Sequence, residues 1–186
     1  MTQKKYLRVG LIGYGKMGRI RHQTLNQMEQ CVVPMVYEYN DNMATPKSLK
    51  RINSAEELIA SNDIDAVVIC VPTPLSDDGT PDLRAVESAA ETIAGHLRPG
   101  TLVVLESTTY PGTTGEFVRP ILEESSGLVA GEDFHLAYSP ERIDPGNERY
   151  GLRNTPKVVG GLTARCTDAA AGFYSELVDE VVPTLG

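Results

Sequence analysis

Apolar and polar positions alternate in blocks along the chain. Short runs that are apolar at nearly every position predict strands covered on both faces, and longer segments with apolar residues three and four apart predict helices. The predicted strands are residues 7–13, 32–38, 66–71, 101–105, 134–138, 157–159 and 180–182, the last at an edge. Because strand and helix alternate from end to end without repeats, the pattern predicts a doubly wound, mostly parallel α/β sheet.

Helices are expected over residues 16–30, from Ser54 to about Ser61, from Thr80-Pro81 to Arg98-Pro99-Gly100, from Thr113 with a kink at Pro120, and along the stripe Cys166, Ala170, Phe173 and Leu177. Two of these starts rest on capping boxes, in which a serine or threonine precedes a glutamate by three positions. They are Ser54 with Glu57 and Thr113 with Glu116. Residues 40–51 have no clear assignment, and residues 139–156 form a long polar loop of the kind that compact domains keep for function.

Composition narrows the class of protein. The 186 residues, 41% of them hydrophobic, suffice for one well-buried domain, here residues 1–186. A formal net charge of −8 argues against a nucleic-acid partner. No apolar stretch approaches the roughly 20 residues of a membrane span, and no secretory signal is seen, so we expect a cytoplasmic protein without a membrane partner. Cys31, Cys70 and Cys166 are expected to be reduced and buried, and no metal site is predicted.

A glycine-rich segment, Gly13-Tyr14-Gly15-Lys16-Met17-Gly18, lies between the first strand and the first helix. Its first glycine permits the turn, its second lets the backbone approach a pyrophosphate, and its third lets the helix pack on the sheet. Glu38 lies twenty residues beyond Gly18 at a strand end, where a carboxylate accepts hydrogen bonds from ribose hydroxyls and repels a 2′-phosphate. The pattern favours NAD over NADP, with Asp41 as the competing ribose ligand and a purely structural glycine turn as the alternative.

From Cys70 onward, three segments carry a resemblance to a known family: Val71-Pro72-Thr73-Pro74, residues 106–114 (ESTTYPGTT) and residues 139–147 (SPERIDPGN). Through them the chain resembles the UDP-glucose/GDP-mannose dehydrogenase family, and the third segment resembles its branch that oxidises UDP-N-acetylhexosamines. The resemblance implies a Rossmann fold and oxidation of a sugar C6 alcohol to a carboxylate by two NAD molecules.

The resemblance also implies roles for individual residues. The implied cofactor contacts are Val71, Pro72, Thr73, Ser107 and Thr108, with Thr108 near the nicotinamide. Glu141 is implied to activate or position the water that hydrolyses a thioester intermediate.

The first 70 residues or so carry a different resemblance. Residues 13–22, 54–59 and 63–68 are similar to the glucose-fructose oxidoreductase and inositol dehydrogenase family. However, Ser107 and Thr108 follow Glu106 where that family has a catalytic lysine and a proline. The chain is therefore interpreted as a mosaic, natural or engineered, joined near residues 70–73.

The nucleotide-sugar family carries its catalytic thiol and most substrate contacts in a domain beyond the point that corresponds to Gly186. None of the three cysteines here has the Gly-rich setting of that thiol. We therefore expect an NAD-binding domain that is not catalytically complete alone and that takes a UDP-sugar only when a substrate domain is supplied. The alternatives are a complete enzyme formed with another chain, or a non-catalytic scaffold that self-associates, for example as a homodimer.

Overall fold

The computed structural model describes residues 7–12, 14, 16–27, 31–38, 44–61, 64–76, 79–142, 149, 151 and 153–185. The strands are β1 Leu7–Ile12, β2 Cys31–Tyr37, β3 Lys50–Ile52, β4 Ala66–Ile69, β5 Leu102–Leu105, β6 His135–Tyr138, β7 Lys157–Gly161 and β8 Val181–Leu185. The helices are α1 Lys16–Leu25, α2 Ala55–Ala60, α3 Arg84–Ala94, the π-helix η1 Thr113–Val118, α4 Arg119–Ser126 and α5 Ala164–Ser175.

Within the described residues, the strands form one eight-stranded sheet in the order β3-β2-β1-β4-β5-β6-β7-β8. The strands from β3 to β6 are parallel, β7 runs antiparallel to β6, and β8 is parallel to β7. The direction of winding reverses between β1 and β4, which creates the switch point where open α/β sheets bind their ligands. The predicted doubly wound, mostly parallel sheet is confirmed.

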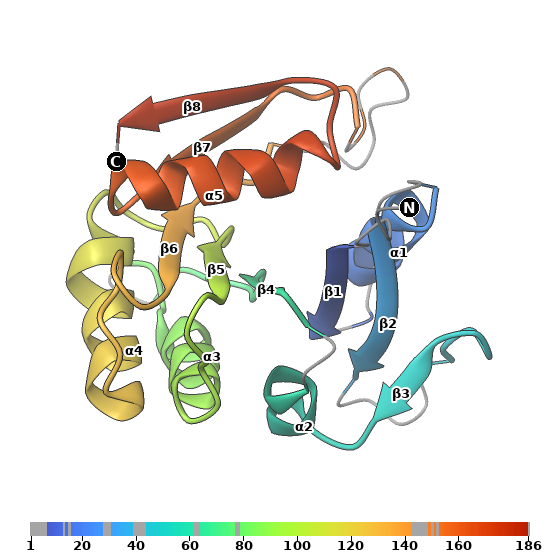
Figure 1. The fold of residues 1–186 in the computed structure, drawn as a ribbon, viewed down its shortest axis with the longest axis horizontal. Helices are drawn as coiled ribbons and strands as arrows, with labels where there is room; N and C mark the ends of the chain where they lie inside the picture. The colour runs from blue at the N-terminus through green and yellow to red at the C-terminus, as the bar shows by residue number, and fades with distance from the viewer. Residues whose placement is uncertain are drawn as a thin grey trace, which may run out of the picture.

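Helices cover both faces of the sheet, and each face has its own core. Figure 1 shows α5 on one side of β5 and β6, with α3 and α4 on the other. Val104 packs in the core beneath α5, while its neighbour Val103 packs with Leu122 of α4 on the opposite face. Because successive side chains of a strand point to opposite faces, a strand between two helical layers must be apolar at every position. All four residues of β5 are buried.

One of the two predicted capping boxes forms and the other does not. Ser54 is the N-cap of α2, and its hydroxyl accepts a hydrogen bond from the Glu57 backbone N–H at 3.1 Å, as predicted. Thr113 instead donates its hydroxyl to the Tyr110 carbonyl at 2.7 Å and is the first residue of a π-helix. The cap position is taken by Gly112, whose φ of 93° lies in the region that favours glycine. The prediction for Thr113 was wrong because the preceding loop uses its hydroxyl.

Several element bounds differ from the predicted ones. Helix α1 ends at Leu25, and the turn after it is closed by a hydrogen bond from the Asn26 N–H to the His22 carbonyl. Helix α3 begins at Arg84 because Asp82, just after Pro81, accepts a hydrogen bond from the Arg84 N–H in a turn before the helix. Residues 40–51, which had no clear assignment from the sequence, include the start of β3 at Lys50.

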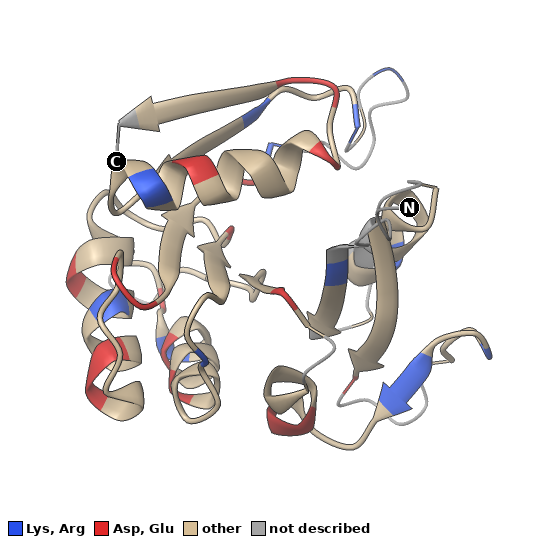
Figure 2. Cartoon of the chain, viewed as in Figure 1, with Lys and Arg blue, Asp and Glu red and all other residues tan. Residues whose placement is uncertain are grey.

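Charge is distributed without a basic stripe over the described part of the chain. Acidic and basic positions follow one another along α4 and α5 in Figure 2. None of the helices described here is long and apolar enough to cross a membrane.

Candidate cofactor site

The predicted site residues lie at the carboxyl ends of neighbouring parallel strands. Glu38 follows β2, residues 70–73 follow β4, residues 106–108 follow β5 and Glu141 lies beyond β6. Gly13, Gly15 and Asp41 lie outside the described residues. Helix α1 begins at Lys16, so Lys16, Met17 and Gly18 form its first turn, as the motif predicts.

Glu38 is joined directly to the glycine loop. Its carboxylate is buried, with 4% of the residue exposed, and Oε2 accepts a hydrogen bond from the Tyr14 backbone N–H. The Glu38 carbonyl in turn accepts a hydrogen bond from the Arg51 guanidinium at 2.8 Å. The acidic group at the end of β2 is therefore held beside the turn that precedes α1, where the sequence predicts a ribose.

Sequence reasoning missed a second anchor of this loop. The Tyr14 hydroxyl lies 2.6 Å from Nδ1 of His22, and Nε2 of His22 lies 2.7 Å from the Asn26 side-chain nitrogen. Burial raises the pKa of Tyr14 above its usual value and lowers the pKa of His22. A neutral imidazole donates through one nitrogen and accepts through the other, which suits a position between two polar partners. The feature of the sequence that could have indicated this anchor is a tyrosine inside the glycine motif with a histidine eight positions later.

The segments after β4 and β5 form one hydrogen-bonded wall, which we call the strand-end wall (residues 70–73 and 106–108). The Ser107 hydroxyl donates to the Val71 carbonyl at 2.7 Å, and the Thr73 hydroxyl donates to the Thr108 carbonyl at 2.6 Å. The structure thus brings together the residues that the family resemblance assigned to cofactor contact. Pro72 is exposed between Val71 and Thr73.

Glu106, the first residue of the second wall segment, is the centre of a buried polar cluster that the sequence did not predict. Glu106 is 4% exposed, and its Oε1 lies 2.8 Å from Lys157 Nζ and accepts a hydrogen bond from the Tyr174 hydroxyl at 2.6 Å. The Cys70 thiol donates to Oε2 at 3.3 Å. Cys31 and Cys166 are buried as expected, but Cys70 is exposed. The prediction for Cys70 was wrong because the residue lies just beyond the end of β4, where the helical cover ends.

Glu141 lies on the segment that follows β6. It is half-buried, and its Oε1 accepts a hydrogen bond from the Arg142 backbone N–H at 2.8 Å. Arg142 also donates to the Pro156 carbonyl at 3.2 Å. Upstream, the buried Ser139 donates to the Val158 carbonyl at 2.8 Å, so the start of the long loop is fixed on β7. Residues 143–148 lie outside the described residues.

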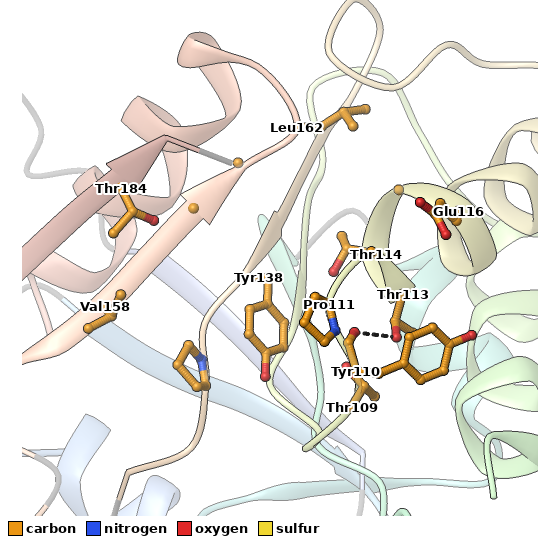
Figure 3. A pocket seen from close by; sticks show the side chains of 15 residues that line it. Thr109, Tyr110, Pro111, Thr113, Thr114, Glu116, Tyr138, Val158, Leu162 and Thr184 are labelled. Carbon is orange, nitrogen blue, oxygen red and sulfur yellow. Dashed lines mark hydrogen bonds between the residues drawn. The ribbon is translucent and has the colours of Figure 1, made fainter. Parts of the chain in front are cut away.

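A cavity of about 630 Å³ opens beside Pro140, the neighbour of Glu141. Its lining residues come from η1 and the segment before it, from the end of β6, and from β7 and β8. Figure 3 shows the rings of Tyr138 and Pro111 side by side in it, and the hydrogen bond from Thr113 to Tyr110 next to Pro111. The cavity lies on the face of β7 that carries Val158, opposite the face that packs on α5.

Fold and site together define a dinucleotide-binding Rossmann domain: a switch point, a glycine loop before α1 and a buried acidic residue at the end of β2. A sequence profile of the UDP-glucose/GDP-mannose dehydrogenase family, NAD binding domain, matches residues 20–178. The chain belongs to this family and is an NAD-binding domain of it. The match runs across residues 70–73, while the separate resemblance of the first 70 residues stays a prediction.

Relatives of this chain include UDP-sugar dehydrogenases. Protein CapL of Staphylococcus aureus is 40% identical over 141 residues, which are 76% of this chain and 32% of CapL. The UDP-N-acetyl-D-glucosamine 6-dehydrogenase of Salmonella typhi is 37% identical over 132 residues, 71% of this chain and 31% of that enzyme. The crystal structure of NDP-N-acetyl-D-galactosaminuronic acid dehydrogenase from Methanosarcina mazei Go1 has a TM-score of 0.82 at 26% identity, over 97% of this chain and 44% of that one. The chain spans about a third of the length of these two curated relatives.

Proposed function

We propose that NAD binds along the carboxyl edge of the sheet with its diphosphate at the start of α1. The backbone of Gly13, Gly15, Lys16, Met17 and Gly18 holds the diphosphate, where amide donors and the helix dipole favour an anion. Glu38 accepts hydrogen bonds from the adenosine ribose. The observation that carries the proposal is the position of the Glu38 carboxylate beside Tyr14.

The nicotinamide half of NAD lies, in this proposal, against the strand-end wall. Its contacts are Val71, Pro72, Thr73, Ser107 and Thr108. The hydrogen bonds from Ser107 to Val71 and from Thr73 to Thr108 support this assignment, since they hold the two segments in one fixed surface. Small side chains on such a surface allow a flat ring to approach closely.

We further propose that the chain is the NAD-binding part of a dehydrogenase that oxidises a UDP-N-acetylhexosamine at C6. NAD, when bound, accepts a hydride from the sugar. Glu141 positions or activates the water that hydrolyses the thioester intermediate and so releases the product. Its half-buried place beyond β6 supports this role. The substrate domain is supplied from outside residues 1–186, a proposal supported by the share of the relatives' length that the chain covers.

Two experiments separate these steps. Titration calorimetry with NAD tests the cofactor site, and no heat of binding at about 1 mM NAD contradicts it. NADH formation from NAD and UDP-N-acetylglucosamine, with and without a substrate domain from a relative, tests the reaction. Activity is expected only in the mixture and is expected to be lost with Glu141→Gln. The proposed reaction is contradicted if no mixture forms NADH, or if the Glu141→Gln variant forms NADH as fast as the unaltered chain.

A second candidate function is self-association, as a homodimer, through the face of β7 and β8 that does not pack on α5. Val182 of β8 is 38% exposed, and the cavity beside Val158 lies on the same side of the sheet. Apolar surface of this kind favours a protein partner. Light scattering at increasing concentration tests the candidate, and a monomer at every concentration contradicts it.

The reduced cysteines support the proposal that the chain works in the cytoplasm.

A further inference from the structure

We propose that Lys157 and Tyr174 are positioning residues for the nicotinamide half of NAD, acting through the buried Glu106 carboxylate. They hold Glu106, and Glu106 holds the strand-end wall. The inference rests on the proposed NAD site and adds residues that neither the glycine motif nor the family's strand-end motif contains.

Glu106 is fixed from two elements that are distant in the sequence. Lys157 begins β7 and Tyr174 lies near the end of α5, and both reach the same carboxylate oxygen, at 2.8 and 2.6 Å. The side chains of Glu106 and Lys157 are each only 5% exposed. The ammonium group of Lys157 also lies 5.1 Å from the centre of the Tyr174 ring, within the range of a cation–π contact.

A charge buried this deeply depends on its partners. An ionised carboxylate taken out of water needs an opposite charge or hydrogen-bond donors, and removing one partner leaves the other charge uncompensated. Loss of the Lys157 ammonium therefore pushes the Glu106 side chain toward solvent or toward its protonated form. Either change alters the backbone that carries Glu106.

That backbone is part of the strand-end wall. Glu106 immediately precedes Ser107 and Thr108, and its own N–H donates to the Ile69 carbonyl at 2.9 Å. Its second carboxylate oxygen accepts the hydrogen bond from Cys70, the first residue of the other segment of the wall. A shift of Glu106 thus moves both segments together. Tyr14 and Glu38 follow β1 and β2, beyond the switch point, and are expected to stay in place.

The test compares NAD with ADP-ribose, which lacks only the nicotinamide ring. Calorimetry on Lys157→Met and Tyr174→Phe is expected to show NAD affinity reduced about tenfold, while ADP-ribose affinity is unchanged. Lys157→Arg keeps the charge and is expected to restore NAD binding. Glu38→Gln is expected to weaken both ligands, since both contain the adenosine ribose.

The matched control is Asp65→Asn, which removes a carboxylate at the opposite end of β4. Asp65 pairs with Arg8 at 2.8 Å, so the control also breaks an ion pair, but it leaves the strand-end wall intact. It is expected to change neither affinity. A general loss of stability lowers the binding of both ligands alike, whereas the positioning role lowers NAD alone.

The outcomes are distinct for each proposal. If the unaltered chain binds neither ligand, the proposed NAD site fails before the variants are considered. If it binds both, and Lys157→Met and Tyr174→Phe change neither affinity or reduce both equally, the positioning role is overturned. Circular dichroism checks the fold of each variant. Should Lys157→Met not fold, Tyr174→Phe decides alone, because it removes one hydroxyl and keeps the ring.

Discussion

The backbone N–H of Tyr14 donates a hydrogen bond to the carboxylate of Glu38, twenty-four residues further along the chain. The turn that precedes α1 and the end of β2 are therefore one unit. A change at either residue is expected to alter the place proposed for the adenosine ribose.

Replacing Glu38 by glutamine is expected to reduce NAD affinity about tenfold and to narrow the preference for NAD over NADP. The change removes the negative charge that strengthens hydrogen bonds from hydroxyls and repels a 2′-phosphate. Calorimetry with both dinucleotides measures it. Glu87→Gln, an exposed change on α3, serves as the control and should leave both affinities as they are. An unaltered ratio of NAD to NADP affinity in Glu38→Gln would count against the ribose role.

Gly161 is expected to be intolerant of any side chain. A Cβ atom there lies 2.2 Å from the Thr167 backbone nitrogen and 2.4 Å from the Cys166 carbonyl carbon, at the start of α5. Because backbone atoms cannot move aside cheaply, Gly161→Ala is expected to lower the free energy of unfolding by about 3 kcal/mol. The melting temperature should fall by roughly 6–12 °C.

Gly172 provides the matched comparison for Gly161. It lies within α5, and a Cβ atom there has open space around it. Gly172→Ala should stabilise the fold by roughly 0.5–1 kcal/mol, because alanine is the better helix former. Thermal unfolding of the two variants side by side gives the result, and equal melting temperatures would contradict the close packing of β7 on α5.

The three cysteines are expected to differ in reactivity. Burial raises the pKa of Cys31 to about 11, and Cys166 is also buried, whereas Cys70 is exposed. A thiol reagent at pH 7.5 should label one cysteine in the native protein and all three in urea, with mass spectrometry locating the first label at Cys70. Saturating NAD should slow that labelling, since Cys70 begins the strand-end wall. Rapid labelling of Cys31 in the native protein would contradict the burial of its thiol in β2.

Stability is expected to fall as the pH drops below about 6.5. Burial lowers the pKa of His22 and of His135 from the ordinary 6.5, so that below this pH the unfolded chain binds more protons than the folded one. The stabilisation is complete above pH 6.5 and is lost progressively as the pH falls toward the folded-state values. Urea unfolding at pH 7.5, 6.5 and 5.5 measures it. His22→Gln should flatten the dependence, and an unchanged slope in that variant would contradict the burial of His22.

The sequence predicted those features whose cause is local. Strand β5 could be located because a strand buried on both faces is apolar at every position, and Ser54 could be identified as a cap because its partner Glu57 lies within one helical turn. The capping box at Thr113 failed because a neighbouring glycine took the cap position. A short motif does not reveal which of two adjacent residues will become the N-cap of the helix.

The partners of Glu106 could not be predicted in the same way. Lys157 lies 51 residues and Tyr174 lies 68 residues further along the chain, on elements that meet Glu106 only because β7 pairs with β6 and α5 packs over the sheet. Each residue taken alone resembles an ordinary strand or helix position. The cluster follows from the topology, which places the start of β7 beyond the carboxyl end of β6.

Calorimetric titration of the unaltered chain with NAD and with NADP at low salt decides whether the start of α1 and Glu38 together hold NAD. NAD is expected to bind with a Kd of about 1 mM or tighter, and NADP is expected to bind at least about tenfold more weakly. No binding of either dinucleotide at that concentration, or NADP binding as tightly as NAD, would contradict it.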